Sequence, residues 1–105
     1  MIKTVVKYVG KELKAAQEYI ELAYEKKSHC PETAELFITL AGEEINHAER
    51  LLKRGQILAG STEPDKESPT YEHDIKNLAI WEWENEKSVE CISALKMSIS
   101  NFKAL

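Results

Sequence analysis

Hydrophobic side chains recur at steps of three and four residues in three long segments, the spacing that places them on one face of an α-helix. These segments cover about 4–27, 32–59 and 70–102. Residues 61–68 (STEPDKES) are polar and contain proline, which is typical of a linker. No strand pattern is present. The sequence therefore predicts an all-α fold in a single domain, 1–105.

The connections between these segments predict how the helices are arranged. Only Ser28–Pro31 separates the first two segments, and so short a link forces an antiparallel helical hairpin. Pro31 suits the first position of the second helix, and Gly60 suits its end. Eight or nine linker residues span at most about 30 Å, whereas the second helix is roughly 40 Å long. The third helix should therefore run antiparallel to the second helix, or pack on another chain.

Two glycines leave alternatives for the start of the first helix and for the packing of the second, and the third helix has an expected apolar stripe. Gly10 weakens the first helix by about 1 kcal/mol relative to alanine, which leaves Lys11 as an alternative start. Gly42 has no capping role, so it either allows a neighbouring helix or ligand to approach closely or is tolerated without purpose. The stripe expected in the third helix, flanked by Trp81 and Trp83, is Ile75, Leu78, Glu82, Asn85, Val89, Ile92, Leu95 or Lys96, and Ile99.

Composition narrows the class of protein. The chain has 105 residues, of which 43% are hydrophobic and 30% charged, with a net charge of −4. This balance argues against a nucleic-acid binder. No apolar run is long enough for a membrane span, and the first residues lack the apolar core of a signal peptide. Cys30 and Cys91 are isolated, so neither a zinc ribbon nor a rubredoxin-type iron site is encoded, and we expect reduced thiols in a cytoplasmic protein.

Three side chains are candidates for metal ligands. Glu44 and His47 are three residues apart on one helical face among apolar neighbours, and Glu12 lies within the apolar stripe of the first helix. Glu12 precedes Ser28 by 16 residues, and His47 follows Pro31 by 16 residues, so the hairpin places them at similar heights. A buried carboxylate and imidazole need a partner. Carboxylates and imidazole suit iron, manganese or zinc.

These residues resemble a known family. Glu12-x6-Tyr19 followed by Glu44-x2-His47 is similar to the first half of ferritin-like di-iron proteins, and PETAELFITLAGEEINHAERL resembles the second helix of rubrerythrin-like domains. The resemblance covers about residues 8–58. It implies that Glu12, Glu44 and His47 bind metal and that Tyr19 lies beside a di-iron site. On physical grounds alone, Tyr19 is more often a core aromatic residue.

The chain departs from that family in a way that predicts an oligomer. A complete ferritin-like domain has four helices and a second Glu-x-x-His, whereas this chain supplies half a site. Glu82 is the best extra ligand in the third helix, and Glu86 is a weaker one. Two hairpins related by a twofold axis would instead supply four glutamates and two histidines, completing a four-helix bundle by dimerisation. Encapsulated ferritins, short chains whose iron site forms between subunits, are the most similar design.

The number of large apolar side chains also favours a homo-oligomer, because three helices should not bury all of these side chains on one another. The side chains in question are Val5, Phe37, Leu51, Trp81, Trp83, Ile99 and Phe102.

The resemblance implies oxidation of Fe(II) by dioxygen or peroxide, as a ferroxidase or a peroxidase. Two other classes stay open: a metal-binding protein without turnover, such as an iron carrier or a zinc-bound structural dimer, and a metal-free helical interaction protein that retains the scaffold.

Overall fold

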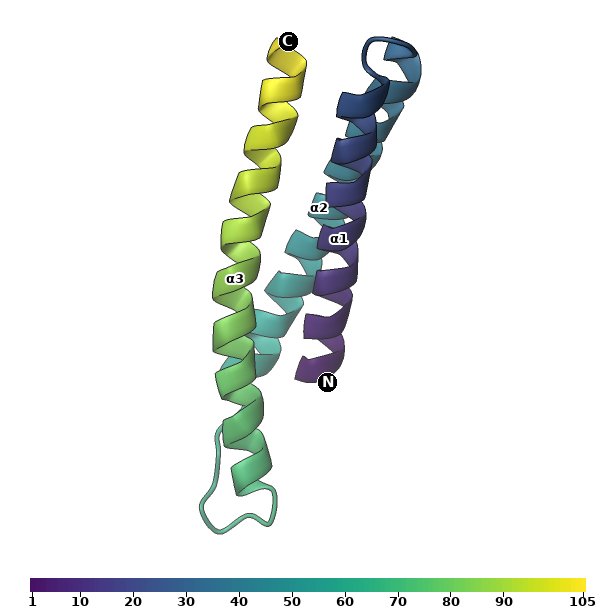
Figure 1. Cartoon of the computed structure of the whole chain (residues 1–105). Coiled ribbons are helices and arrows are strands. Elements are labelled where there is room, and N and C mark those ends of the chain that lie inside the picture. Colours follow the sequence, from purple (N-terminus) through teal and green to yellow (C-terminus); the bar gives the residue numbers. More distant parts are fainter.

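The computed structural model describes residues 1–105 and contains three α-helices and no strands. The helices are α1 (Ile2–Lys26), α2 (Pro31–Gly60) and α3 (Tyr71–Ala104). They form an elongated bundle of 62 × 18 × 16 Å. Figure 1 shows α1 and α2 as an antiparallel hairpin, with α3 antiparallel to α2 along its side. None of the three helices has an apolar stretch long enough to cross a membrane.

The two helices of the hairpin pack through a seam of small and branched side chains, which we call the core seam. On α2 its members follow one another at alternating steps of four and three residues, the spacing of a coiled-coil contact. Every seventh residue of this seam is small, which allows the two helix axes to approach closely. The buried residues of the core seam on α2 are Ala34, Ile38, Ala41, Ile45, Ala48, Leu52 and Gly55. Those on α1 are Ile2, Val5, Val9, Leu13, Ala16, Ile20 and Ala23.

Helix α3 packs along one side of this hairpin and is anchored at both ends. Near its start, the ring of Trp81 lies directly on Gly55 of α2. Near its end, the Tyr24 hydroxyl donates a hydrogen bond of 2.8 Å to the carbonyl of Ser98. The Lys27 ammonium donates one of 3.0 Å to the carbonyl of Phe102. These contacts join α3 to both helices of the hairpin.

The boundaries of the helices lie within two residues of the predicted ones, but the buried face of α3 differs from the expected stripe. Val89 is 56% exposed and Ile75 is also exposed. The expected stripe was right at Ile92 and Leu95 and wrong at Ile75, Glu82 and Val89, because α3 carries apolar residues on two faces and periodicity alone does not say which face packs. The residues that α3 buries are Trp81, Ser88, Ile92, Leu95 and Phe102.

The structure also settles the roles of the glycines. Gly10 does not delay α1, because the buried Val5 and Val9 hold the residues before it in the helix. Gly42 faces open space, and the close approach occurs at Gly55 instead. Gly60 does not adopt the left-handed conformation of a C-terminal glycine.

Hydroxyl groups close the end of α2 instead. The side chain of Ser61 donates to the carbonyl of Ile57 at 2.8 Å, and the side chain of Thr62 donates to that of Leu58 at 2.9 Å. The Thr62 hydroxyl satisfies a carbonyl at the helix end, and the Ser61 hydroxyl is a second donor to the Ile57 carbonyl, which also accepts from the Ser61 backbone N–H at 3.1 Å.

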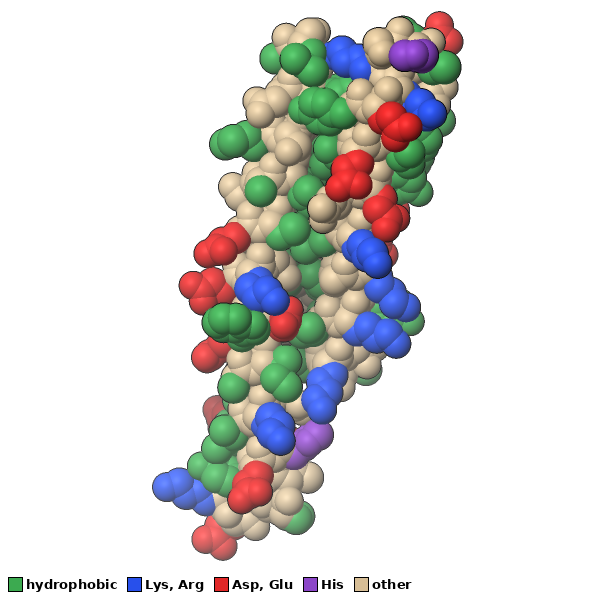
Figure 2. Space-filling view, viewed as in Figure 1, with side chains coloured by type: hydrophobic (Ala, Val, Ile, Leu, Met, Phe, Trp, Pro, Cys, Tyr) green, Lys and Arg blue, Asp and Glu red, His purple; other side chains and the backbone are tan.

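Most of the apolar side chains expected to need a partner chain are covered within this one. Figure 2 shows hydrophobic side chains gathered between α3 and the hairpin. Val5, Trp81 and Phe102 are buried, whereas Trp83 is 64% exposed. Phe37, Leu51 and Ile99 are partly buried against the core. These apolar side chains therefore support an oligomer less strongly than the sequence indicated.

Candidate metal centre

A second face of the hairpin, which we call the open face, carries the candidate ligands. On α2 it consists of residues that follow one another at steps of three and four, one position away from the core seam: Phe37, Leu40, Glu44, His47 and Leu51. On α1 it consists of Tyr8, Glu12, Ala15 and Tyr19. These residues are partly buried or exposed, whereas those of the core seam are buried. Because the two stripes are neighbours and both contain apolar residues, Glu44 and His47 were predicted to lie deeper in the core than they do.

Glu12, Glu44 and His47 converge in the middle of the open face, as the register of the hairpin predicted. One ligand atom from each side chain lies within 4.8 Å of the others. His47 Nδ1 lies 3.6 Å from Glu12 Oε2 and 3.9 Å from Glu44 Oε2. The side chains of Glu12 and Glu44 are 26% and 22% exposed, and that of His47 is 49% exposed. The trio therefore lies at the surface, with the carboxylates more sheltered than the imidazole.

The donor set and its spacing fit a divalent metal ion. Two carboxylate oxygens and one imidazole nitrogen are ligands that iron, manganese and zinc accept. Metal–ligand bonds of about 2.0–2.2 Å place two ligands of one ion roughly 3–4 Å apart, and the distances of 3.6 and 3.9 Å lie in that range. Both are too long for strong hydrogen bonds. A cation between the three donors would contact each of them after small side-chain movements.

Two further residues border the trio. Arg50 and Leu51 line the same shallow pocket as Glu12 and His47. Arg50 lies three residues after His47, so one turn of α2 brings its guanidinium to the edge of the pocket. Arg50 was not among the residues predicted for the site, although its three-residue spacing from His47 could have indicated it. It is the one basic residue that lines this pocket.

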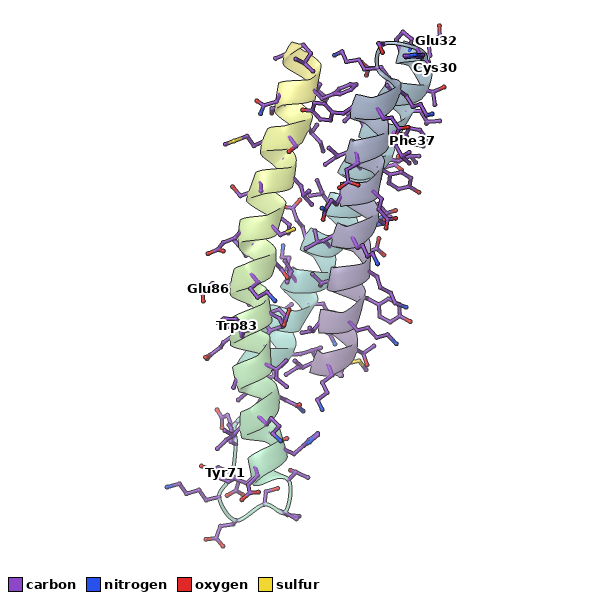
Figure 3. All side chains as sticks on the ribbon, viewed as in Figure 1. Cys30, Glu32, Phe37, Tyr71, Trp83 and Glu86 are labelled. Atoms are coloured by element: carbon purple, nitrogen blue, oxygen red, sulfur yellow. The ribbon has the colours of Figure 1, made fainter.

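Tyr19 lies on the open face but belongs to an aromatic pair. Its ring stacks on that of Phe37 with 6.0 Å between centroids and an interplanar angle of 20°. Tyr19 is seven residues from Glu12, and Phe37 is seven residues from Glu44, which separates the pair from the trio by roughly 10 Å along the helices. Figure 3 shows Phe37 on the side of the hairpin that faces away from α3. The pair covers one end of the open face.

Glu82 and Glu86, the extra ligands considered in α3, lie apart from the trio. Both are exposed, and the group of close ligand atoms contains neither of them. In Figure 3 Glu86 points away from the hairpin. The reason is the side on which α3 packs: it lies against the hairpin through Trp81 and Ile92, so the neighbouring residue Glu82 is turned outward. Within one copy of the chain, α3 adds no ligand.

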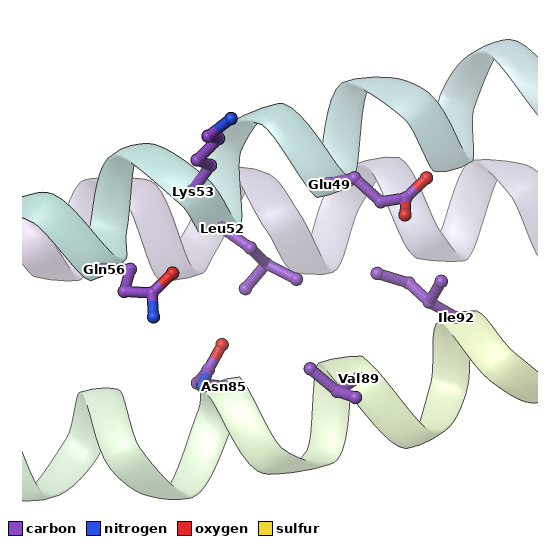
Figure 4. Close-up of a pocket in the computed structure, with 7 residues that line it drawn as sticks. All are labelled: Glu49, Leu52, Lys53, Gln56, Asn85, Val89 and Ile92. Carbon is purple, nitrogen blue, oxygen red and sulfur yellow. The ribbon is translucent and has the colours of Figure 1, made fainter.

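Another depression lies between α2 and α3 (Figure 4). It is lined by Glu49, Leu52, Lys53, Gln56, Asn85, Val89 and Ile92. Glu49, its one acidic residue, pairs with Lys96 at 3.0 Å. With one carboxylate, no histidine and no cysteine, this groove has no ligand set for a metal ion.

The packing of α3 leaves the open face uncovered. The contacts of α3 with the hairpin include Gly55 and Glu49 of α2, Tyr24 of α1, and Lys27 in the turn after α1. None of these residues belongs to the open face. The trio and the aromatic pair therefore form a surface that a second hairpin can reach without displacing α3.

Comparison with known proteins returned no match: no family model, no curated protein and no solved structure is significantly similar to this chain.

Proposed function

We propose that the chain binds iron through Glu12, Glu44 and His47 and oxidises Fe(II) with dioxygen or peroxide. The observation that carries this proposal is the convergence of the three donors from two helices within 4.8 Å of one another. The assignment of iron and of redox chemistry rests on the resemblance of these residues to ferritin-like proteins. Manganese or zinc would fit the same donors.

The site is completed by a second copy of the chain. Three ligands leave a divalent ion unsaturated, and His47 is half exposed on a surface that α3 does not cover. A twofold axis through the open face would bring two trios together, with four carboxylates and two imidazoles. This is the ligand complement of a carboxylate-bridged pair of metals in a four-helix bundle. The four helices would be α1 and α2 from each copy, with α3 on the outside.

In this arrangement each side chain has a defined task. Glu44 would bridge the two metal positions, Glu12 would bind one of them terminally, and His47 would bind through Nδ1, the nitrogen that faces both carboxylates. The four carboxylates balance the charge of two divalent ions. Bound Fe(II) would supply the electrons that reduce the oxidant. The protein holds the ions close together and shields them between two hairpins.

The test is aerobic addition of Fe(II) to the metal-free protein, followed by ferric absorbance and by metal analysis. Glu44→Gln should abolish oxidation because it removes the bridging charge. Glu43→Gln is the matched control, since Glu43 is adjacent, exposed and outside the trio. Equal oxidation rates in the two variants would show that the trio is not the site. Sedimentation of the loaded protein should show a dimer or a larger assembly.

A metal-free helical interaction protein is the second candidate. The observation that favours it is that His47, when protonated, can pair with both carboxylates without any ion. Absence of bound iron, manganese and zinc after incubation would exclude the metal-binding proposals and leave this alternative. Metal uptake without oxidation would instead indicate an iron carrier or a structural metal site.

A further inference from the structure

The outer face of α3 carries exposed aromatic and acidic side chains that nothing within the chain covers. Trp83 is 64% exposed and points away from the hairpin, as does Glu86 (Figure 3). Glu82, Glu86 and Glu90 follow one another at four-residue steps and are all exposed. We call Trp83 and these three glutamates the acidic ridge. Met97, further along α3, is also 64% exposed.

The charges of the acidic ridge are not neutralised within the chain. No lysine, arginine or histidine lies within 4.0 Å of Glu82, Glu86 or Glu90. The nearby Lys87 pairs with Glu84, and its ammonium lies 5.9 Å from the centroid of the Trp83 ring. The carboxylates of the ridge are therefore free to pair with a basic surface.

Helix α1 presents such a surface. Lys3, Lys7 and Lys11 are exposed, lie at the same four-residue steps, and form no ion pair. We call these three residues the lysine ridge. Figure 2 shows basic side chains gathered along the lower part of α1, and acidic side chains along the outer edge of α3. Both ridges point outward, so one copy of the chain cannot pair its own two ridges.

We propose that the acidic ridge of one copy docks on the lysine ridge of another copy. Steps of four residues correspond to about 6 Å along a helix, so each glutamate can face one lysine when the two helices lie side by side. Trp83 would be covered by the aliphatic parts of the lysines, with cation–π attraction to their ammonium groups. Pairing of two acidic ridges is disfavoured, because it would bring six carboxylates together.

This contact uses two different surfaces, so it is heterologous and builds a ring or a chain of copies. It is separate from the twofold contact through the open face and does not depend on metal. Charged contacts of this kind weaken as salt rises. Self-association of the metal-free protein should therefore decrease by about tenfold between about 50 mM and 500 mM NaCl.

A charge-reversal exchange tests the proposal in the presence of a chelator. The triple variants E82K/E86K/E90K and K3E/K7E/K11E should each lose self-association at low salt by about tenfold. A mixture of the two should associate again, because each then presents the ridge that the other lacks. Sedimentation velocity measures association. A change in tryptophan emission on association reports on Trp83, since Trp81 is already buried within the chain and keeps its surroundings.

Far-ultraviolet circular dichroism of each variant checks that the helices are intact, which surface substitutions should preserve. Lys66→Glu is the control, because Lys66 is exposed in the linker between α2 and α3, away from both ridges. Wild-type protein that sediments identically at both salt concentrations would overturn the proposal. So would a mixture of the two triple variants that associates no better than either one alone.

Discussion

Gly55 of α2 is the position at which one added methyl group should be most costly. An ideal Cβ built there would lie 2.5 Å from Trp81 Cη2 and nearer still to Cζ3, against a comfortable carbon–carbon separation of about 3.5–4.0 Å. Trp81 is buried, so its ring has little room to move aside. Overpacking of this kind costs about 1–3 kcal/mol. Alanine recovers about 1 kcal/mol through its greater helix propensity, which leaves Gly55→Ala destabilised by up to about 2 kcal/mol.

Gly42→Ala is the matched control in the same helix. A Cβ at Gly42 meets nothing within 4 Å, so only the propensity gain applies and the free energy of unfolding should rise by about 0.5–1 kcal/mol. Urea unfolding of the two metal-free variants at the same protein concentration, followed by circular dichroism, measures both free energies of unfolding. With a slope of roughly 1–2 kcal/mol/M, the two midpoints should move in opposite directions, with a separation of about 1 M.

A third variant tests whether the Trp81 ring causes the destabilisation of Gly55→Ala. In a Trp81→Phe background the contacting atoms Cζ3 and Cη2 are absent, so Gly55→Ala should lose most of its cost. The non-additivity of the double-mutant cycle then measures the contact. The packing described for α3 would be refuted if Gly55→Ala stabilised the protein as much as Gly42→Ala does, or if the cycle were additive.

Two predictions concern the metal centre. Saturating Mn(II) or Zn(II), at about 100 times the dissociation constant, should stabilise the protein by about 2.7 kcal/mol, visible as a higher thermal midpoint. His47→Ala should remove this shift and His29→Ala should keep it, because His29 lies outside the trio; equal shifts would exclude His47 as a ligand. Tyr19→Phe retains the stacked ring on Phe37, so stability should change by less than about 1 kcal/mol while iron oxidation slows; an unchanged oxidation rate would make Tyr19 a packing residue only.

The helices and the convergence of Glu12, Glu44 and His47 could be predicted from sequence because each depends on local information. Periodicity gives the extent of a helix, and a four-residue link gives the register of a hairpin. Glu12 could therefore be matched in height with His47 by counting residues from the turn. The direction of α3 followed similarly from the short reach of its linker.

The packing of α3 could not be predicted, because the choice depends on contacts between distant residues. Ile75 and Val89 are as apolar as Ile92, yet only Ile92 is buried. On the face that packs, the Trp81 ring lies on Gly55, a contact that no local pattern encodes. The outward position of Glu82 follows from this choice, and so does the open face that surrounds the trio.

The small residues of the core seam have one more consequence. Ala34, Ala41 and Ala48 repeat every seven residues, so a hairpin displaced by seven residues would bring small side chains together almost equally well. Such a slip would carry Glu12 roughly 10 Å away from its partners. The turn at Lys27–Cys30 is too short to permit it. The turn, more than 20 Å from the three donors, thus fixes the register that keeps them aligned. Lengthening the turn with flexible residues would move the donors apart without changing any of the three side chains.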